Sequence, residues 1–239
     1  MREFVGSFKE FISDPQVANL PLETARKWYD TYTRLPSISE KLYNKLHTSE
    51  LVKTNIKINV SEFKKEIKFY ENKFTKWGKK YPKVPRFGIP MVNLTGSLDE
   101  DDDPSRQPLD EYFFNLQKVL HDAEIKTKTE VCNMKTLEPL KILHPYLIRS
   151  SILKWDKGGF FAPHCDVYIP APNLRLWGTT SNNIELIIGK KIQKNIEPGR
   201  IYIIDTAKEH EAKSFEDKVY QFFIGLSIDS YDTLKKIKC

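Results

Sequence analysis

Residues 158–180 read GGFFAPHCDVYIPAPNLRLWGTT, and this stretch decides the fold. Two runs rich in aromatic and branched residues, near Phe161–Tyr168 and Leu174–Thr180, are separated by a short loop with two prolines. Runs of this kind, bounded by glycine and proline, are typical of β-strands. No segment long enough for a helix lies between them, so the stretch indicates β-structure built from short neighbouring strands.

The same pattern continues on both sides of this stretch. We expect further strands near Tyr146–Trp155, Asn183–Gly189, Arg200–Asp205 and Lys218–Ile228, because β-branched and aromatic residues alternate there with turn signals. Many short strands without intervening helices predict an antiparallel sandwich, barrel or jelly roll.

The N-terminal part has a helical pattern instead. Within residues 61–82, SEFKKEIKFYENKFTKWGKKYP, apolar residues recur at spacings of 4, 3, 4 and 3, which predicts one helix with a stripe facing the core. Ser61 is a plausible N-cap, and a second helix is expected over 109–122. Between the two helices we expect a short extended piece and an acidic loop. The stripe consists of Phe63, Ile67, Tyr70, Phe74 and Trp77.

We therefore expect one domain over residues 1–239, with a mainly helical part over 1–139 packed outside a β-core over 140–230. The chain of 239 residues is 40% hydrophobic and 29% charged, which allows a packed core. It has three cysteines, no apolar run long enough to span a bilayer and no secretory signal pattern. These features favour a cytoplasmic protein without a membrane partner.

The net charge of +6 allows an acidic partner or nucleic acid. Lysines are dense between Lys41 and Arg86, but no recognised nucleic-acid motif accompanies them. We interpret them as the solvated faces of helices and expect no nucleic-acid partner. The sequence carries no signal for oligomeric state.

His164 and Asp166 are two residues apart in an expected strand, so their side chains share one face and form half of a metal site. His210 follows a Pro-Gly turn and a strand, and it is the best candidate for a third ligand. Two histidines and one carboxylate on a β-scaffold are typical of non-haem Fe(II) oxygenases. The alternative is a surface histidine beside an aspartate at the end of a strand.

Lys218 opens the last expected strand, KVYQFFIGLSI, and shares the phase of Tyr220, Phe222 and Ile224. A lysine on an apolar face needs an anion or access to water. We expect it to face the interior and bind the carboxylate of a small ligand. The alternatives are a lysine that reaches solvent or one that pairs with an acidic side chain of the protein.

Together these motifs resemble a known family. The pattern H-x-D, then P-G-x-x-Y-x-x-D-T-x-x-x-H, then a basic residue before an apolar strand, resembles the Fe(II)/2-oxoglutarate-dependent oxygenases. Within this superfamily the chain is most similar to the aspartyl/asparaginyl β-hydroxylase branch. Three strings carry that narrower resemblance, SILKWDKGGFFAPHCD at 151–166, NLRLWGTT at 173–180 and DTAKEHEAKSFEDKVYQFFIGLSID at 205–229.

The resemblance implies an α+β protein with a double-stranded β-helix (jelly roll) core. It implies that His164, Asp166 and His210 bind Fe(II), and that Lys218 pairs with the distal carboxylate of 2-oxoglutarate. The family usually has arginine where this chain has lysine. If Lys218 is not the anchor, Arg175 and Arg149 are the next candidates.

Two further residues match the family's cosubstrate contacts. Ser151 matches a strand serine that contacts the cosubstrate, and Arg175 matches the first arginine of an N-x-R-L string. The implied activity is hydroxylation of an amino-acid side chain, in a peptide or a free amino acid, with succinate and CO₂ as coproducts. The partner is then a peptide or small-molecule substrate. The alternatives are a cupin-like metalloprotein that does not use 2-oxoglutarate and a binding module without catalysis.

Overall fold

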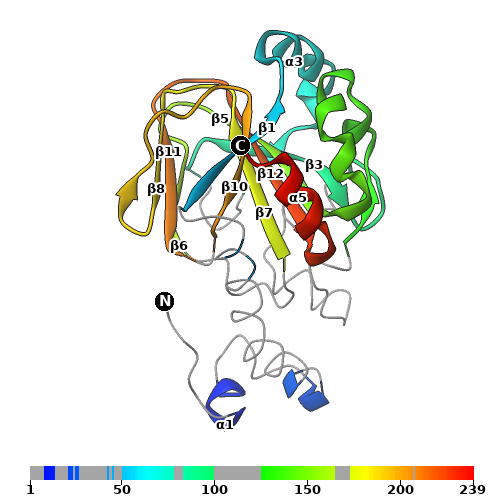
Figure 1. Ribbon diagram of the computed structural model, residues 1–239, viewed down its shortest axis with the longest axis vertical. Helices are drawn as coiled ribbons and strands as arrows, with labels where there is room; N and C mark the ends of the chain where they lie inside the picture. The colour runs from blue at the N-terminus through cyan, green and yellow to red at the C-terminus, as the bar shows by residue number, and fades with distance from the viewer. Residues whose placement is uncertain are drawn as a thin grey trace.

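A computed structural model gives the architecture of the chain (Figure 1). It describes residues 8–13, 21–23, 25–26, 42, 45, 50–77, 83–99, 125–164, 173–206 and 208–239. Within these residues two antiparallel sheets face each other, and helices cover the outer face of the larger one.

The larger sheet has eight strands in the order β1-β10-β7-β12-β5-β3-β2, and β4 pairs with β3. Every pairing in it is antiparallel. Its strands are β1 (Leu51–Lys57), β2 (Thr75–Lys76), β3 (Arg86–Asn93), β4 (Thr127–Lys128), β5 (Leu147–Trp155), β7 (Asn173–Thr179), β10 (Arg200–Ile204) and β12 (Val219–Ser227).

The smaller sheet has four strands in the order β6-β11-β8-β9. Its strands are β6 (Phe160–His164), β8 (Ile184–Ile188), β9 (Lys191–Ile192) and β11 (His210–Ser214). The chain passes repeatedly between the sheets, since β5, β7, β10 and β12 lie in the larger sheet while β6, β8, β9 and β11 lie in the smaller. Each sheet thus interleaves strands from distant parts of the chain. This topology is a jelly roll, and it confirms the expected fold class.

Two apolar clusters hold the layers together. Between the sheets, Trp155, Trp177 and Leu186 are almost fully buried. On the other face of the larger sheet, Phe222 packs edge-on against Phe63 with ring centroids 5.0 Å apart. Because successive side chains of a strand point to opposite faces, each central strand contributes to both clusters.

The helical elements are short and lie mostly on the outer face of the larger sheet, where Figure 1 shows α3 and α5. Within the described residues none of them combines the length and the apolar character that a membrane span requires. They are α1 (Phe8–Phe11), α3 (Val60–Glu66), α5 (Tyr231–Ile237) and the 3₁₀ segments η1 (Ile67–Lys73), η4 (Glu130–Asn133), η5 (Lys135–Tyr146) and η7 (Ile228–Ser230).

The helix expected over residues 61–80 is shorter than its apolar stripe. Asn59, and not Ser61, is the N-cap, since its side chain accepts a hydrogen bond from the Glu62 N–H at 3.2 Å. The helix becomes 3₁₀ at Ile67, and β2 follows directly after Phe74. Phe63 and Ile67 are core residues as expected. The stripe continues past the helix because extended backbone places later apolar residues against the same sheets.

The segment before residue 140 is less helical than we predicted. Its described part contributes β1 to β4, and β3 is buried along nearly its whole length. A central strand buried on both faces has no polar-apolar alternation, so the pattern did not identify it as a full strand. The helix expected over 109–122 and most of the acidic loop lie outside the described residues.

Candidate metal and anion site

The two predicted histidine ligands meet on neighbouring strands of the smaller sheet. His164, at the end of β6, is the register partner of His210, at the start of β11. Their ring centroids are 4.3 Å apart and the ring planes are inclined by 48°. His210 is buried and His164 is partly exposed. The strand pairing therefore brings together two imidazoles that are distant in the sequence.

Main-chain carbonyls fix the orientation of both rings. Nδ1 of His164 lies 2.7 Å from the Ala162 carbonyl oxygen, and Nδ1 of His210 lies 3.0 Å from that of Lys208. A carbonyl oxygen only accepts hydrogen bonds, so each Nδ1 carries the proton when the ring is neutral. The lone pair is then on Nε2. Histidines that bind metal are commonly held in this way, and the pair fits a metal centre.

The third predicted ligand, Asp166, lies outside the described residues, and its role stays a prediction. Among the residues that are described, no group of three or more histidine, cysteine or acidic side chains could hold a metal ion. The histidine pair therefore needs Asp166, or another donor, to complete the facial set of ligands that the sequence predicts.

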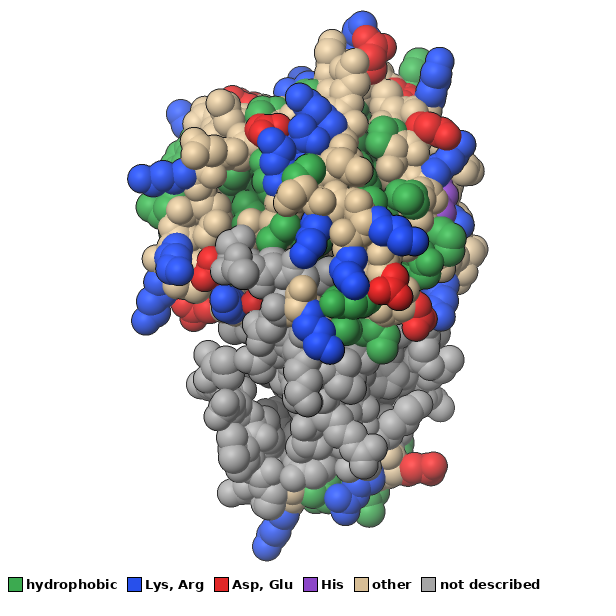
Figure 2. All heavy atoms as spheres, viewed as in Figure 1, with side chains coloured by type: hydrophobic (Ala, Val, Ile, Leu, Met, Phe, Trp, Pro, Cys, Tyr) green, Lys and Arg blue, Asp and Glu red, His purple; other side chains and the backbone are tan. Residues whose placement is uncertain are grey.

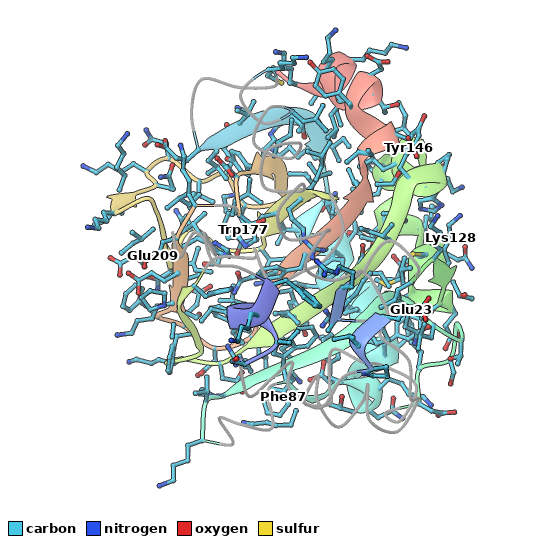
Figure 3. The ribbon with its side chains drawn as sticks, turned by 90° about the horizontal axis from the view of Figure 1, so that it is seen from below. Glu23, Phe87, Lys128, Tyr146, Trp177 and Glu209 are labelled. Atoms are coloured by element: carbon cyan, nitrogen blue, oxygen red, sulfur yellow. The ribbon has the colours of Figure 1, made fainter. Side chains whose placement is uncertain are left out.

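Both histidines line a pocket of about 220 Å³ between the sheets. One part of its wall is apolar and includes Trp177, which lies toward the middle of the molecule in Figure 3. Phe161 and Phe223 contact each other edge-on in this wall, with ring centroids 5.6 Å apart. The remaining wall is polar and is formed by Arg149, Ser150, Ser151, Arg175, Thr206 and the two histidines.

Two arginines are among the residues that line the pocket. Arg149 lies on β5 and Arg175 on β7, and both are partly buried. Nη1 of Arg175 donates a hydrogen bond to the Arg149 carbonyl oxygen at 3.4 Å. Guanidinium groups stay protonated at any physiological pH and match the geometry of carboxylates. This wall of the pocket is suited to an anionic ligand.

Ser151 and Arg175, which the family resemblance implies as cosubstrate contacts, both line this pocket. Ser151 is almost fully buried, at 3% exposure. Arg149, which is a candidate anchor only if Lys218 is not, lines the pocket as well. The structure brings these three residues together with the histidine pair, and their role in binding stays a prediction.

The prediction that Lys218 faces the interior is wrong. Lys218 is exposed, lies in the turn before β12 with φ of 56°, and its N–H donates to Oδ1 of Asp156 at 3.2 Å. The residues whose phase Lys218 was expected to share also point away from the pocket. Phe222 and Ile224 pack in the apolar cluster on the helix-covered face of the larger sheet. The pocket side of β12 is the side of Phe223, one residue out of phase.

Sequence reasoning also missed part of the aromatic wall. Trp77, which we assigned to a helix stripe, lines the pocket from the end of β2. Arg86 of β3 supports Phe161, since its guanidinium carbon lies 4.3 Å from the ring centroid and its Nη1 donates to the Phe160 carbonyl oxygen at 2.7 Å. The sequence contains no local signal for these contacts, because they join strands far apart in the chain.

No family model and no curated protein matches this chain. Among solved structures, KdgF from Halomonas sp. is 18% identical, with 36% of this chain and 74% of that chain covered and a TM-score of 0.27. An RmlC-like cupin from Shewanella frigidimarina is 10% identical, with 36% of this chain and 71% of that chain covered and a TM-score of 0.27. A salicylate 1,2-dioxygenase from Pseudaminobacter salicylatoxidans is 11% identical, with 34% of this chain and 21% of that chain covered and a TM-score of 0.27. Likenesses this low carry no weight in assigning a family or an activity.

Proposed function

We propose that this protein is an Fe(II)- and 2-oxoglutarate-dependent dioxygenase that hydroxylates an amino-acid side chain, in a peptide or a free amino acid, with succinate and CO₂ as coproducts. The observation that carries the proposal is the pairing of His164 with His210 in one pocket with Arg149 and Arg175. A metal-binding pair and two permanent cations in one small pocket suit a ligand that has both a chelating group and a carboxylate.

In this proposal His164, His210 and Asp166 hold the metal. The hydrogen bonds from each Nδ1 to a main-chain carbonyl keep both rings in the tautomer that metal binding requires. When bound, ferrous iron supplies oxygen activation coupled to the decarboxylation of 2-oxoglutarate.

The arginines and Ser151 bind the cosubstrate in this scheme. Arg175 or Arg149 pairs with a carboxylate, and the Ser151 hydroxyl donates a hydrogen bond to it. The pocket volume of about 220 Å³ is below the roughly 300–1,000 Å³ of pockets for drug-sized ligands, which suits a small acid. The aromatic wall keeps water out of the region between the carboxylate and the histidines.

The charge of the protein supports an acidic or carboxylate-bearing substrate. The net charge is +6, and Figure 2 shows lysine and arginine side chains spread over the described part of one face, with fewer acidic side chains among them. A positive field raises the encounter rate with anions. A substrate with a carboxylate is favoured over an apolar small molecule.

The exposed position of Lys218 favours a second candidate, a metal-binding protein of the same fold that does not use 2-oxoglutarate. A cupin-like protein of this kind has no need of an inward lysine, whereas the oxygenase needs a cation that pairs with the carboxylate of its cosubstrate. Arg149 and Arg175 line the pocket and can supply that cation, which supports the oxygenase.

The decisive test is anaerobic titration of the protein with Fe(II) and then 2-oxoglutarate. The oxygenase should give a weak visible charge-transfer band that needs both additions and is lost in His210→Ala. Release of succinate against a panel of peptides and amino acids should then identify the substrate. A protein that binds the metal but stays colourless with 2-oxoglutarate would be the second candidate.

A further inference from the structure

The pocket-lining part of β5 breaks the rule that successive side chains of a strand alternate between faces. Arg149, Ser150 and Ser151 follow one another directly, and all three line the pocket. In a regular strand only every second residue reaches the same face. The local backbone of β5 must therefore depart from regular geometry.

The departure is a β-bulge opposite β12. Phe223 pairs with Ser151, but Gly225 pairs with Ile148, so two steps along β12 correspond to three along β5. Arg149 and Ser150 are therefore the two residues of β5 that lie opposite a single residue of β12. Bulges re-aim side chains and are common beside functional sites.

The Ser150 side chain closes the bulge. Its hydroxyl accepts a hydrogen bond from the Gly225 N–H at 3.0 Å and donates one to the Ile148 carbonyl oxygen at 2.7 Å. Ser150 is buried, at 2% exposure. A side-chain hydroxyl thus replaces ladder hydrogen bonds that the bulge interrupts.

The absence of a side chain at Gly225 leaves space for the Arg175 guanidinium and the Arg149 carbonyl group. A Cβ at this position would lie 2.5 Å from Nη1 of Arg175 and 2.6 Å from the Arg149 carbonyl oxygen. These are the same two atoms that are joined by a hydrogen bond of 3.4 Å. Any side chain larger than that of glycine must displace the guanidinium, the bulge or both.

We infer that Ser150 and Gly225 are positioning residues, which hold the Arg175 guanidinium and the Arg149 main chain where a ligand carboxylate binds. The bulge, closed by Ser150, sets the position of the Arg149 carbonyl oxygen. That oxygen and the open space over Gly225 then set the position of Arg175. The inference rests on the proposed function only in naming 2-oxoglutarate as the source of the carboxylate.

The test compares two variants with two matched controls in the full-length protein. Gly225→Ala and Ser150→Ala are the test variants. Gly178→Ala is the glycine control, because its Cβ would meet Ile201 and the Arg200 carbonyl oxygen at 2.7 and 2.9 Å, away from both pocket arginines. Ser230→Ala is the serine control, since it removes a buried hydroxyl that donates to the Ser227 carbonyl oxygen.

The measurements are the Kd of Mn(II), a redox-inert stand-in for iron, and the Kd of 2-oxoglutarate in its presence. Both test variants should weaken 2-oxoglutarate binding by about tenfold or more, as expected for a lost buried hydrogen bond or a misplaced anchor. Mn(II) binding should change by less than about twofold, because the histidines lie on the other sheet. Ser150→Ala introduces no clash and carries the test if Gly225→Ala does not fold.

Wild-type-like 2-oxoglutarate binding in both test variants, or equal losses in the controls, would overturn the inference. A wild-type protein that binds no 2-oxoglutarate would overturn the proposed function instead. Crystal structures of the folded test variants then decide the positioning role without any ligand. A displaced Arg175 guanidinium supports it, and an unmoved one refutes it.

Discussion

Arg175 and Lys218 show that the phase of a residue, and not its charge, decides whether it reaches the pocket. Both are cations near the expected cosubstrate site in the sequence, yet Arg175 lines the pocket and Lys218 is exposed. The face of β12 that points between the sheets is that of Phe223. An error of one residue in phase exchanges the faces of a strand completely.

This contrast gives a prediction for a pair of variants. Arg175→Met should raise the KM for 2-oxoglutarate by about tenfold or more, because a charge-assisted hydrogen bond contributes about 1.5–3 kcal/mol. Lys218→Ala should leave that KM unchanged and is the matched control. Steady-state succinate release at varied 2-oxoglutarate measures both. A larger effect from Lys218→Ala than from Arg175→Met would indicate that Lys218, and not Arg175, binds the carboxylate of 2-oxoglutarate.

Among the elements, strands with strong apolar runs can be predicted from the sequence. A strand that forms only because neighbouring strands pair with it cannot. The strands β5, β7, β8, β10 and β12 lie within two residues of their expected bounds. By contrast, β11 has the sequence HEAKS, without apolar alternation, and the pattern predicts no strand there. It is a strand because β6 and β8 pair with its two edges. The tertiary pairing, and not the local propensity, decides its structure.

The candidate site likewise contains residues whose placement could be predicted from the sequence and residues whose placement could not. His164, Ser151 and Arg175 belong to strands that the pattern identifies, so their grouping could be predicted. The placement of Arg149 depends on a bulge formed between Ser150 and Gly225, which are 75 residues apart. No local pattern encodes such a long-range hydrogen bond.

The junction between α3 and η5 allows a prediction on stability. The Glu66 carboxylate accepts hydrogen bonds from the N–H groups of Lys135 and Thr136, at 2.8 and 2.9 Å, and from the Thr136 hydroxyl at 2.6 Å. Glu66→Gln should lower the free energy of unfolding by about 1–2 kcal/mol at neutral pH, since charged acceptors make the stronger hydrogen bonds. Glu62→Gln on the same helix, whose ion pair with Lys65 is exposed, should have little effect.

The pH dependence of this effect has a definite sign. Burial raises the pKa of Glu66, but its hydrogen bonds to Thr136 and Lys135 outweigh burial, so the pKa lies below the ordinary value. A lowered folded-state pKa contributes stability that is present above the unfolded-state pKa, about 4.3, and is lost as pH falls through the folded-state value. Chemical denaturation from neutral to acidic pH should therefore show the difference between wild type and Glu66→Gln shrinking. A constant difference would contradict this assignment.

For the whole molecule, the charge of +6 predicts how turnover depends on salt. Exposed charges are screened over about 10 Å at 0.1 M ionic strength. The kcat/KM for an acidic substrate should fall as salt rises, while kcat at saturation should change little, because steering acts on the encounter. Salt-insensitive turnover of a neutral aromatic substrate would argue against a carboxylate-bearing substrate and leave the metal chemistry untouched.

The division of the site between the two sheets has a consequence for chain-length selectivity. The histidines belong to the smaller sheet and Arg149 and Arg175 to the larger one, and facing sheets are about 10 Å apart. A ligand that chelates at one side and pairs its far carboxylate at the other must span this gap. If the protein is the proposed oxygenase, the thickness of the sandwich, set by core side chains such as Trp177 and Leu186, determines the length of the acid that fits. Preference for a shorter or longer 2-oxo acid could change through core substitutions alone, without altering any residue that touches the ligand's charged ends.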